Sequence, residues 1–327
     1  MSIVGEIAKQ TIIKYPKTPT KTLAQKLVKE NPEVFLSVES ARGVIRYYRG
    51  TIGTRCRKAA SFIQPKEGEY SPFDDLPKPL TDYADWSHVA LGKGRWLVFA
   101  DAHIPYYHKD AFEIVLREGK NRGIDGIVML GDIADFYSVS FWCKDPRRRD
   151  LAKERKAVLD TLGVIRDLFP DIPIIYKLGN HEERLERYLR VKAPELLDME
   201  MLSFESIIEA DKYDIQVVGD KRLITLGRLY LLHGHEFGVT FFSPVNPARG
   251  LYLRGKEIAL CAHYHRSSQH TEKSLADVIT SCWSIGGLCD LHPEYRPMNN
   301  WNHGFAIIDN DDEFVVTNHR IINGRVY

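Results

Sequence analysis

Side chains that commonly bind metal ions follow five short apolar runs in this sequence. The runs cover residues 96–100, 127–130, 172–178, 229–232 and 258–262. The seven candidate ligands are Asp101, His103, Asp132, Asn180, His233, His263 and His265. Because open α/β sheets collect ligands at the carboxyl ends of their strands, we expect these side chains to meet at one centre. Mixed carboxylate, imidazole and amide ligands suit divalent first-row metals better than calcium or a thiolate site.

The run at 127–130 is followed by two acids, Asp132 and Asp135. An acidic pair at the mouth of a buried strand is costly unless a positive charge neutralises it. A bound cation would supply that charge. Asp135 is also open to a simpler interpretation, as the cap of a loop.

Each histidine taken alone is more often a hydrogen-bonded structural residue than a ligand. The recurrence of ligand types after successive runs favours a functional role for His103, His181, His233, His263 and His265. For His235, His270, His292 and His303 we expect structural roles.

The elements that must position these residues alternate between strand and helix from residue 95 onward. Helical patterns at 109–120 and 150–168 separate the first three strands, which predicts an α/β sheet. Residues 305–308 and 314–317 flank a polar turn and predict a terminal hairpin. The second half is therefore richer in strands than a doubly wound fold.

Residues 1–50 predict three short helices, the third capped by Ser37. Residues 1–60 hold 12 Lys and Arg against 4 Glu and no Asp, which gives them a formal charge of +8. The whole chain carries +1, so the remaining residues are acidic on balance. Arg42, Arg46 and Arg49 share one face of the third helix, which is similar to a helix-turn-helix unit that contacts DNA. Another nucleic-acid role or a protein-docking face remains open.

Residues 51–93 are rich in Gly, Pro and Asp and predict a linker that packs on the main domain.

Composition excludes several classes of protein. Hydrophobic residues make up 44% and charged residues 27%, as in globular proteins. No apolar run approaches the roughly 20 residues of a membrane span, and the N-terminal residues do not resemble a secretory signal. The five cysteines form no C-x-x-C pair, which favours a reducing compartment, and we expect a cytoplasmic protein without membrane partners.

The motifs together resemble one known family. Asp101-x-His103, Gly131-Asp132-x-x-Asp135, Gly179-Asn180-His181-Glu182, His233-Gly234 and His263-x-His265 are similar, in order and spacing, to the calcineurin-like metallophosphoesterases. The resemblance runs from about residue 95 to residue 270. One departure is Ala262, which stands where the family usually has glycine.

The resemblance implies a four-layer α/β/β/α sandwich at residues 94–327, preceded by the small all-α three-helix domain. It implies two divalent metal ions, manganese first, with iron, zinc or nickel also compatible. Asp101, His103 and His265 would hold one ion, Asn180, His233 and His263 the other, and Asp132 would bridge them. A metal-bridging hydroxide would attack phosphorus, with His181 as general acid and Asp135 orienting His181.

The implied activity is phosphoester hydrolysis, and the basic N-terminal segment favours a phosphodiesterase or nuclease that acts on nucleic acid, DNA first. A phosphomonoesterase is the chief alternative, and a DNA-binding regulator with a degenerate enzyme domain is another. Arg147 and Arg148 could contact phosphate or could belong to a solvated helix entry. Tyr106 could line the substrate pocket. Oligomeric state, strand polarity and endo or exo cleavage stay open.

Overall fold

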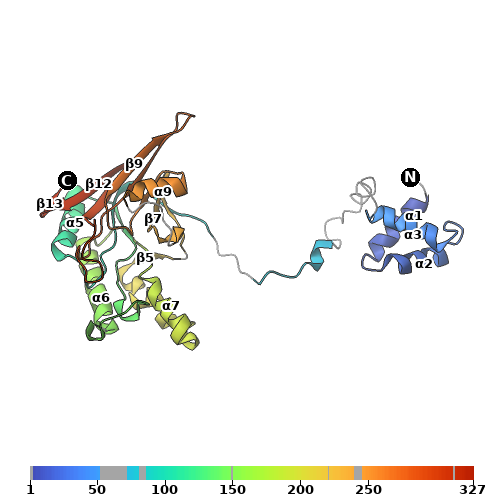
Figure 1. The fold of residues 1–327 in the computed structure, drawn as a ribbon, viewed down its shortest axis with the longest axis horizontal. Helices are drawn as coiled ribbons and strands as arrows, with labels where there is room; N and C mark the ends of the chain where they lie inside the picture. Colours follow the sequence, from blue (N-terminus) through green and yellow to red (C-terminus); the bar gives the residue numbers. More distant parts are fainter. Residues whose placement is uncertain are drawn as a thin grey trace. The chain divides into compact units, whose positions relative to one another are not determined.

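The computed structural model describes residues 3–51, 72–80, 86–148, 150–219, 221–238, 245–311 and 314–327. The chain divides into two units, Met1–Tyr83 and Ala84–Tyr327 (Figure 1). Most of the predicted linker, residues 51–93, lies outside the described residues.

The first unit contains the three predicted helices, α1 Ile3–Lys14, α2 Thr20–Glu30 and α3 Val38–Tyr48. The Ser37 side chain accepts the backbone N–H of Ser40 and so caps α3, as predicted. The helices bury one small apolar core of their own. Ala41 and Ile45 contribute the buried stripe of α3.

Arg49 follows α3 and holds this unit together. Its guanidinium donates to the carbonyl oxygens of Pro16 and Thr18 and to Thr20 Oγ1. Arg49 therefore binds the α1–α2 connection, and of the three arginines predicted to share this helix face, Arg42 and Arg46 stay candidates for nucleic-acid contact. The connection between α2 and α3 covers residues 31–37. This connection is longer than the turn of roughly three or four residues in DNA-binding helix-turn-helix units.

The second unit is built on two mixed sheets. One has seven strands in the order β13-β12-β11-β2-β3-β4-β5. Its strands are β2 Gly94–Phe99, β3 Gly126–Leu130, β4 Ile174–Lys177, β5 Ile215–Val218, β11 His303–Asn310, β12 Phe314–Ile322 and β13 Arg325–Val326. β2 to β5 run parallel, and β11 and β12 form the predicted hairpin.

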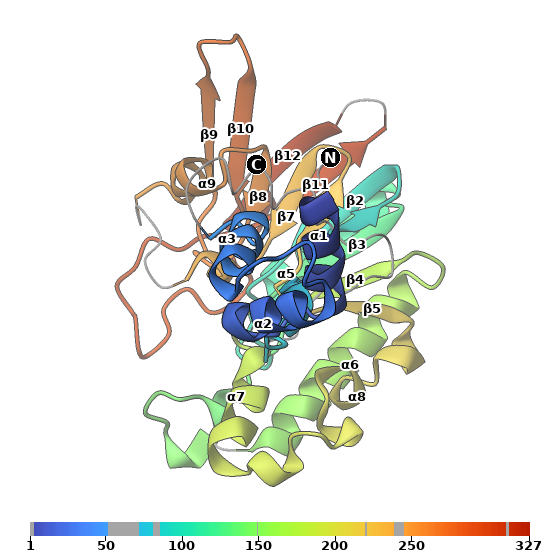
Figure 2. The same cartoon turned by 90° about the vertical axis from the view of Figure 1, so that its right-hand side faces the viewer.

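The other sheet has six strands in the order β1-β6-β7-β8-β10-β9. They are β1 Val89–Leu91, β6 Ile224–Leu226, β7 Leu229–Leu232, β8 Ala259–Cys261, β9 Ser268–Lys273 and β10 Ile279–Ser284. β1 pairs in parallel with β6, so the end of the segment predicted as linker is a strand of the main domain. Its three residues give too short a pattern to separate from the preceding loop. Figure 2 shows β9 and β10 as a hairpin that projects from the sheet.

Alternating side chains along the strands divide between two apolar cores. In β2, Val98 faces the second sheet, whereas Leu97 and Phe99 face a helical layer. That layer contains α5 Lys109–Arg122 and α6 Leu151–Leu168. The predicted helices at 109–120 and 150–168 are therefore confirmed.

The six-stranded sheet shows the same division of its two faces. Leu231 of β7 lies in the core between the sheets, and Leu232 packs with Leu251 of α9 Pro247–Gly255. Figure 1 shows α9 on the side of the sheets opposite α5. The layers are therefore helix, sheet, sheet, helix, which confirms the predicted α/β/β/α sandwich.

Two further helices, α7 Glu183–Lys192 and α8 Phe204–Ile207, follow β4. None of the helices in the described ranges has the length and apolar character that a membrane crossing requires.

Candidate metal centre

The loops after β2 and β3 lie side by side and hold two of the predicted motifs together. Asp101 N–H donates to the carbonyl oxygen of Gly131 at 3.0 Å, and His103 N–H donates to that of Asp132 at 3.0 Å. These bonds continue the parallel pairing of the two strands past their carboxyl ends. The first two motifs therefore face one another because their strands are neighbours in the sheet.

Five of the predicted ligands have a left-handed backbone. Their φ angles are 52° at Asp101, His103 and Asp132, 69° at His263 and 53° at His265. Residues with side chains rarely adopt this conformation, which costs about 1–3 kcal/mol at each position. Its repetition at five chemically related residues indicates that the loops are shaped for a site and not for stability alone.

The first ligand group joins residues from the two sheets. His103 Nε2 lies 3.2 Å from His265 Nε2, and His265 Nε2 lies 3.4 Å from Asp101 Oδ1. All three side chains are buried. Three ligand atoms at this spacing can surround one cation.

The second group is centred on His233. Its Nε2 lies 3.3 Å from Asp132 Oδ2 and 3.3 Å from His263 Nδ1. The other ring nitrogen, Nδ1, donates to the carbonyl oxygen of Leu130 at 2.8 Å. That bond leaves the lone pair of Nε2 available for a metal.

Two buried oxygens of the predicted ligand set lack any hydrogen-bond partner in the described part of the chain, Asp101 Oδ1 and Asn180 Oδ1. Buried polar atoms are normally satisfied, so each such atom requires an explanation. Asn180 lies between Gly179 and His181, and His181 N–H donates to Asp132 Oδ1. The orphaned oxygens and the facing imidazoles fit a pair of divalent cations, which would bind these atoms directly.

The charge of Asp132 is balanced by the neighbouring histidines. Burial opposes ionisation of Asp132, but the imidazoles of His181 and His233 hold its pKa well below the usual range. Burial likewise opposes protonation of His233, but Asp132 raises its pKa to about 10. Burial lowers the pKa of His263 to about 4. Metal ions would take over the neutralising role of protons at this site.

Two glycines allow the close approach of these loops. A Cβ atom at Gly131, whose φ is +91°, would lie 2.5 Å from His233 Nδ1. A Cβ atom at Gly179 would lie 2.3 Å from Asp132 Oδ1. Ala262, which stands where the family usually has glycine, is buried between the sheets. Its backbone N–H donates to the carbonyl oxygen of His233 at 2.9 Å, so the alanine fits this position.

Glu182 holds the loop of Asp132 in place, a role that the sequence analysis missed. Its two carboxylate oxygens accept the backbone N–H groups of four residues and the hydroxyl of Tyr176. The four are Asp132, Ile133, Ala134 and Gly179. Glu236 does the same for His233, accepting the N–H groups of His233 and Gly234. In both motifs a glutamate shortly follows the ligand, and this is the feature of the sequence that could have predicted the supporting role.

His181 and Asp135 lie together as predicted. His181 Nδ1 is 2.8 Å from Asp135 Oδ1, and the same oxygen is 3.0 Å from His103 Nδ1. Asp135 therefore orients two imidazoles. His181 Nε2 accepts a hydrogen bond from Arg184 at 2.7 Å, so both of its ring nitrogens are engaged by protein groups. His181 Nε2 also lies 3.7 Å from Asp132 Oδ2, so the ring stands beside the ligand cluster with both of its nitrogens hydrogen-bonded.

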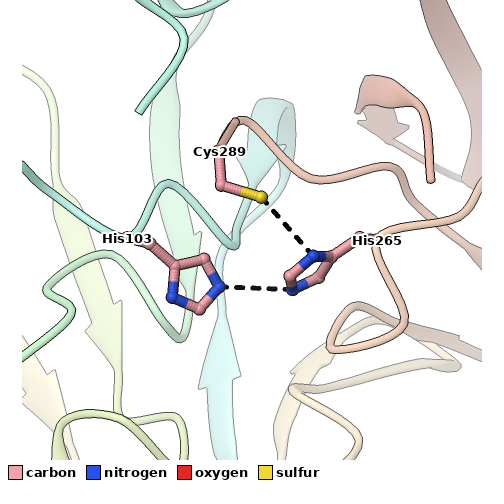
Figure 3. A group of neighbouring side chains, drawn as sticks. All are labelled: His103, His265 and Cys289. Atoms are coloured by element: carbon pink, nitrogen blue, oxygen red, sulfur yellow. Dashed lines mark hydrogen bonds between the residues drawn. The ribbon is translucent and has the colours of Figure 1, made fainter. Parts of the chain in front are cut away.

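Cys289 lies against the first ligand group. Its Sγ is 3.4 Å from His265 Nδ1, and the opposite nitrogen of that ring faces His103 (Figure 3). With Nε2 of His265 on a metal, the Nδ1–H group would donate to the sulfur and fix the ring. No pattern around Cys289 in the sequence predicts this contact, because it lies 24 residues from His265.

Replacing Cys289 with alanine is expected to weaken metal binding roughly tenfold, because partners that orient a ligating histidine contribute about 10–100-fold in affinity. Titration of the metal-free protein with Mn²⁺ by calorimetry measures this. Cys289→Ser should restore binding, since its hydroxyl also accepts a hydrogen bond. Cys282→Ala, a buried cysteine in the α9 core, is the control. Equal Mn²⁺ affinity in Cys289→Ala and the unaltered protein would remove this role.

Comparison with known proteins agrees with this geometry. Residues 94–277 match the family model of the calcineurin-like phosphoesterases. The chain belongs to the calcineurin-like phosphoesterases. It is therefore a hydrolase that acts on phosphoester bonds.

Individual relatives are distant. The Gene 54 protein of Mycobacterium phage L5 is 25% identical over 240 residues, covering 68% of this chain and 91% of that protein. Vacuolar Protein Sorting 29 from Cryptosporidium parvum is 12% identical with a TM-score of 0.38, covering 72% and 96%. Yfce, a phosphoesterase from E. coli, is 14% identical with a TM-score of 0.32, covering 66% and 89%. The family assignment rests on the family model.

The predicted phosphate contacts divide between the two units. Arg147 and Arg148 line a cavity together with Tyr106, which follows the first ligand motif. Arg42 and Arg46 belong to the three-helix unit, where Arg46 is exposed and Arg42 lies 3.6 Å from Glu39.

Proposed function

We propose that this phosphoesterase hydrolyses phosphodiester bonds in nucleic acid, using two divalent metal ions, with manganese the first candidate. The observation that carries the substrate class is the charge of the first 60 residues, +8 in a chain whose total is +1. A basic module concentrates polyanions near the hydrolase to which it is joined. Small phosphomonoesters would gain little from such a module.

The two metal sites would be formed by Asp101, His103 and His265 and by Asn180, His233 and His263, with Asp132 shared between them. Divalent ions there would supply a nucleophilic water at neutral pH and charge stabilisation at phosphorus. The protein itself contributes the burial of the cluster, the fixed loops of Asp132 and His233, and the orientation of His181.

His181 would act on the leaving-group oxygen. Asp135 accepts from Nδ1 and Arg184 donates to Nε2, so the ring is held at the edge of the ligand cluster. Exchange of the Arg184 contact for the leaving oxygen would let a protonated His181 act as a general acid. His181 N–H also supports Asp132, but through the backbone, which a substitution retains.

Replacing His181 with alanine is expected to retain metal and to lower turnover by roughly 10²–10⁴-fold, the usual contribution of a general acid. Metal content by mass spectrometry and hydrolysis of bis-p-nitrophenyl phosphate with Mn²⁺ measure the two quantities separately. The exposed His88 provides the matched control, His88→Ala. Loss of metal in His181→Ala would make it a ligand, and normal turnover would remove any catalytic role.

The substrate class is tested with labelled single- and double-stranded DNA and RNA in Mn²⁺, beside bis-p-nitrophenyl phosphate and the monoester p-nitrophenyl phosphate. We expect cleavage of nucleic acid and preference for the diester. In the full chain, Arg42→Glu with Arg46→Glu should lower the ratio of DNA cleavage to small-diester hydrolysis. Hydrolysis of the monoester alone, with every polynucleotide intact, would make the protein a phosphomonoesterase.

A further inference from the structure

A cavity of about 780 Å³ begins beside the candidate metal centre. Pro105 and Tyr106 line it, and Tyr106 N–H donates to the carbonyl oxygen of His103 at 2.7 Å. The cavity is therefore joined to the first ligand motif through the backbone of Tyr106. Small-ligand pockets span about 300–1,000 Å³, so the space exceeds what a single phosphate group needs.

Arg147 and Arg148 also line the cavity, and they end the segment 137–148, called here the aromatic loop. Its beginning is fixed, because the Tyr137 ring packs edge-on against Tyr106 at 5.8 Å and Ser138 donates to the buried Glu154 of α6. Its end is fixed too, because Tyr137 Oη accepts the backbone N–H of Asp145 at 2.7 Å. The aromatic loop is therefore anchored to the main domain through Tyr137 and Ser138, and its far end is tied back to Tyr137.

The middle of the aromatic loop carries two large rings in solvent. Phe141 is 84% and Trp142 is 74% exposed, and their ring centroids lie 6.0 Å apart. Exposed aromatic rings at a fixed position are what binding surfaces for unpaired bases present, since every base has a face on which a ring can stack. A duplex has its bases already stacked and would not use these rings.

Positive charge follows the rings within six residues. Arg147 and Arg148 line the cavity, and their partners Asp145 and Glu294 form ion pairs at the surface. The Arg148–Glu294 pair is exposed on both sides and contributes only about 0–1 kcal/mol, so a phosphate group can replace it at little cost. Arginine beside stacking rings matches a nucleic-acid backbone with its bases turned outward.

We propose that the aromatic loop and its cavity bind single-stranded nucleic acid next to the phosphodiester that is cleaved, with Phe141 and Trp142 stacking on bases and Arg147 and Arg148 contacting the backbone. This inference rests on the proposed nuclease function and adds the strand form and the binding residues. The cavity is lined by Tyr106, whose backbone N–H bonds to the ligand His103, and this closeness to the metal centre favours a substrate strand over a separate protein partner.

The test measures binding without cleavage, with the full chain in EDTA and a fluorescein-labelled 15-residue oligo-dT followed by anisotropy. Trp142→Ala should raise the Kd about tenfold or more, since stacking on one ring contributes roughly 5–150-fold. Phe141→Ala with Trp142→Ala should raise it further, and Arg148→Ala should reduce its salt dependence. Trp86→Ala, which removes another exposed ring, is the matched control and should bind normally.

Cleavage assays in Mn²⁺ distinguish a failure of this inference from a failure of the proposed nuclease function. With Trp142→Ala, the ratio of oligonucleotide cleavage to bis-p-nitrophenyl phosphate hydrolysis should fall with binding. Normal binding in all the loop variants, with nucleic acid still cleaved, would overturn this inference and leave the proposed function intact. If the unaltered protein cleaved no polynucleotide, the proposed function and this inference would both fail.

Discussion

Asp132→Asn is expected to abolish metal loading and activity together. Asp132 Oδ2 lies 3.3 Å from His233 Nε2, and its carboxylate lies within reach of both ligand groups. A neutral amide cannot offset the repulsion between two dications, and it turns a donor group toward one of them. Because a catalytic metal contributes several kcal/mol of transition-state stabilisation, we expect turnover to fall about 10³-fold or more.

Metal content after Mn²⁺ loading and bis-p-nitrophenyl phosphate turnover give the two readouts. Asp198→Asn, at an exposed position, is the matched control. Unfolding should not explain the loss, because the amide oxygen can still accept from His181. Burial and repulsion from Asp132 both raise the pKa of Glu182, and the substitution removes the repulsion. Two bound metal ions with normal turnover in Asp132→Asn would refute the bridging role.

Glu182→Ala is expected to cause the largest loss of stability among single substitutions at the site. The substitution leaves four buried N–H groups and the hydroxyl of Tyr176 without their acceptor. Each unsatisfied buried group costs about 1–3 kcal/mol, and partial relaxation of the loop should leave a net loss of about 3–5 kcal/mol. Because the same loop carries Asp132, metal affinity should fall with stability.

Urea unfolding of the metal-free protein measures this loss. Glu186→Ala, an exposed acid on the same helix that pairs with Arg190, should change the free energy of unfolding by no more than about 0.5 kcal/mol. Tyr176→Phe removes one of the five hydrogen bonds to Glu182. Its loss of unfolding free energy should lie between the losses of Glu182→Ala and Glu186→Ala. An unchanged urea midpoint in Glu182→Ala would show that backbone pairing holds the Asp132 loop without the carboxylate.

Several elements were predictable because their signals are local. The run at 127–130 is unbroken and apolar, and the observed β3 Gly126–Leu130 adds only Gly126 to it. The cap of α3 at Ser37 depends on residues within one helical turn. β1 was missed because three residues beside a polar segment show no period of their own, and only pairing with β6 makes them a strand.

Other features depend on contacts between distant segments. The stripe of Arg42, Arg46 and Arg49 was read from helical spacing, but the loop between α1 and α2 takes up Arg49. Glu182 stands in a motif that the sequence displays, yet its role depends on the loop 48–50 residues earlier that folds around it. Tyr106 and Arg148 lie far apart in the chain and meet at one cavity because the aromatic loop returns to the first ligand motif.

The sequence by itself determined the chemistry: which side chains could bind metal, that they follow strands, and that the set resembles a phosphoesterase family. The tertiary structure alone decided how those atoms meet. His103 faces His265 across 162 positions because two separate sheets stack, and local sequence carries no record of that packing. The left-handed turns at the ligands and the cradle of Glu182 likewise exist because the surrounding fold holds them, since neither is the conformation that the isolated segment prefers.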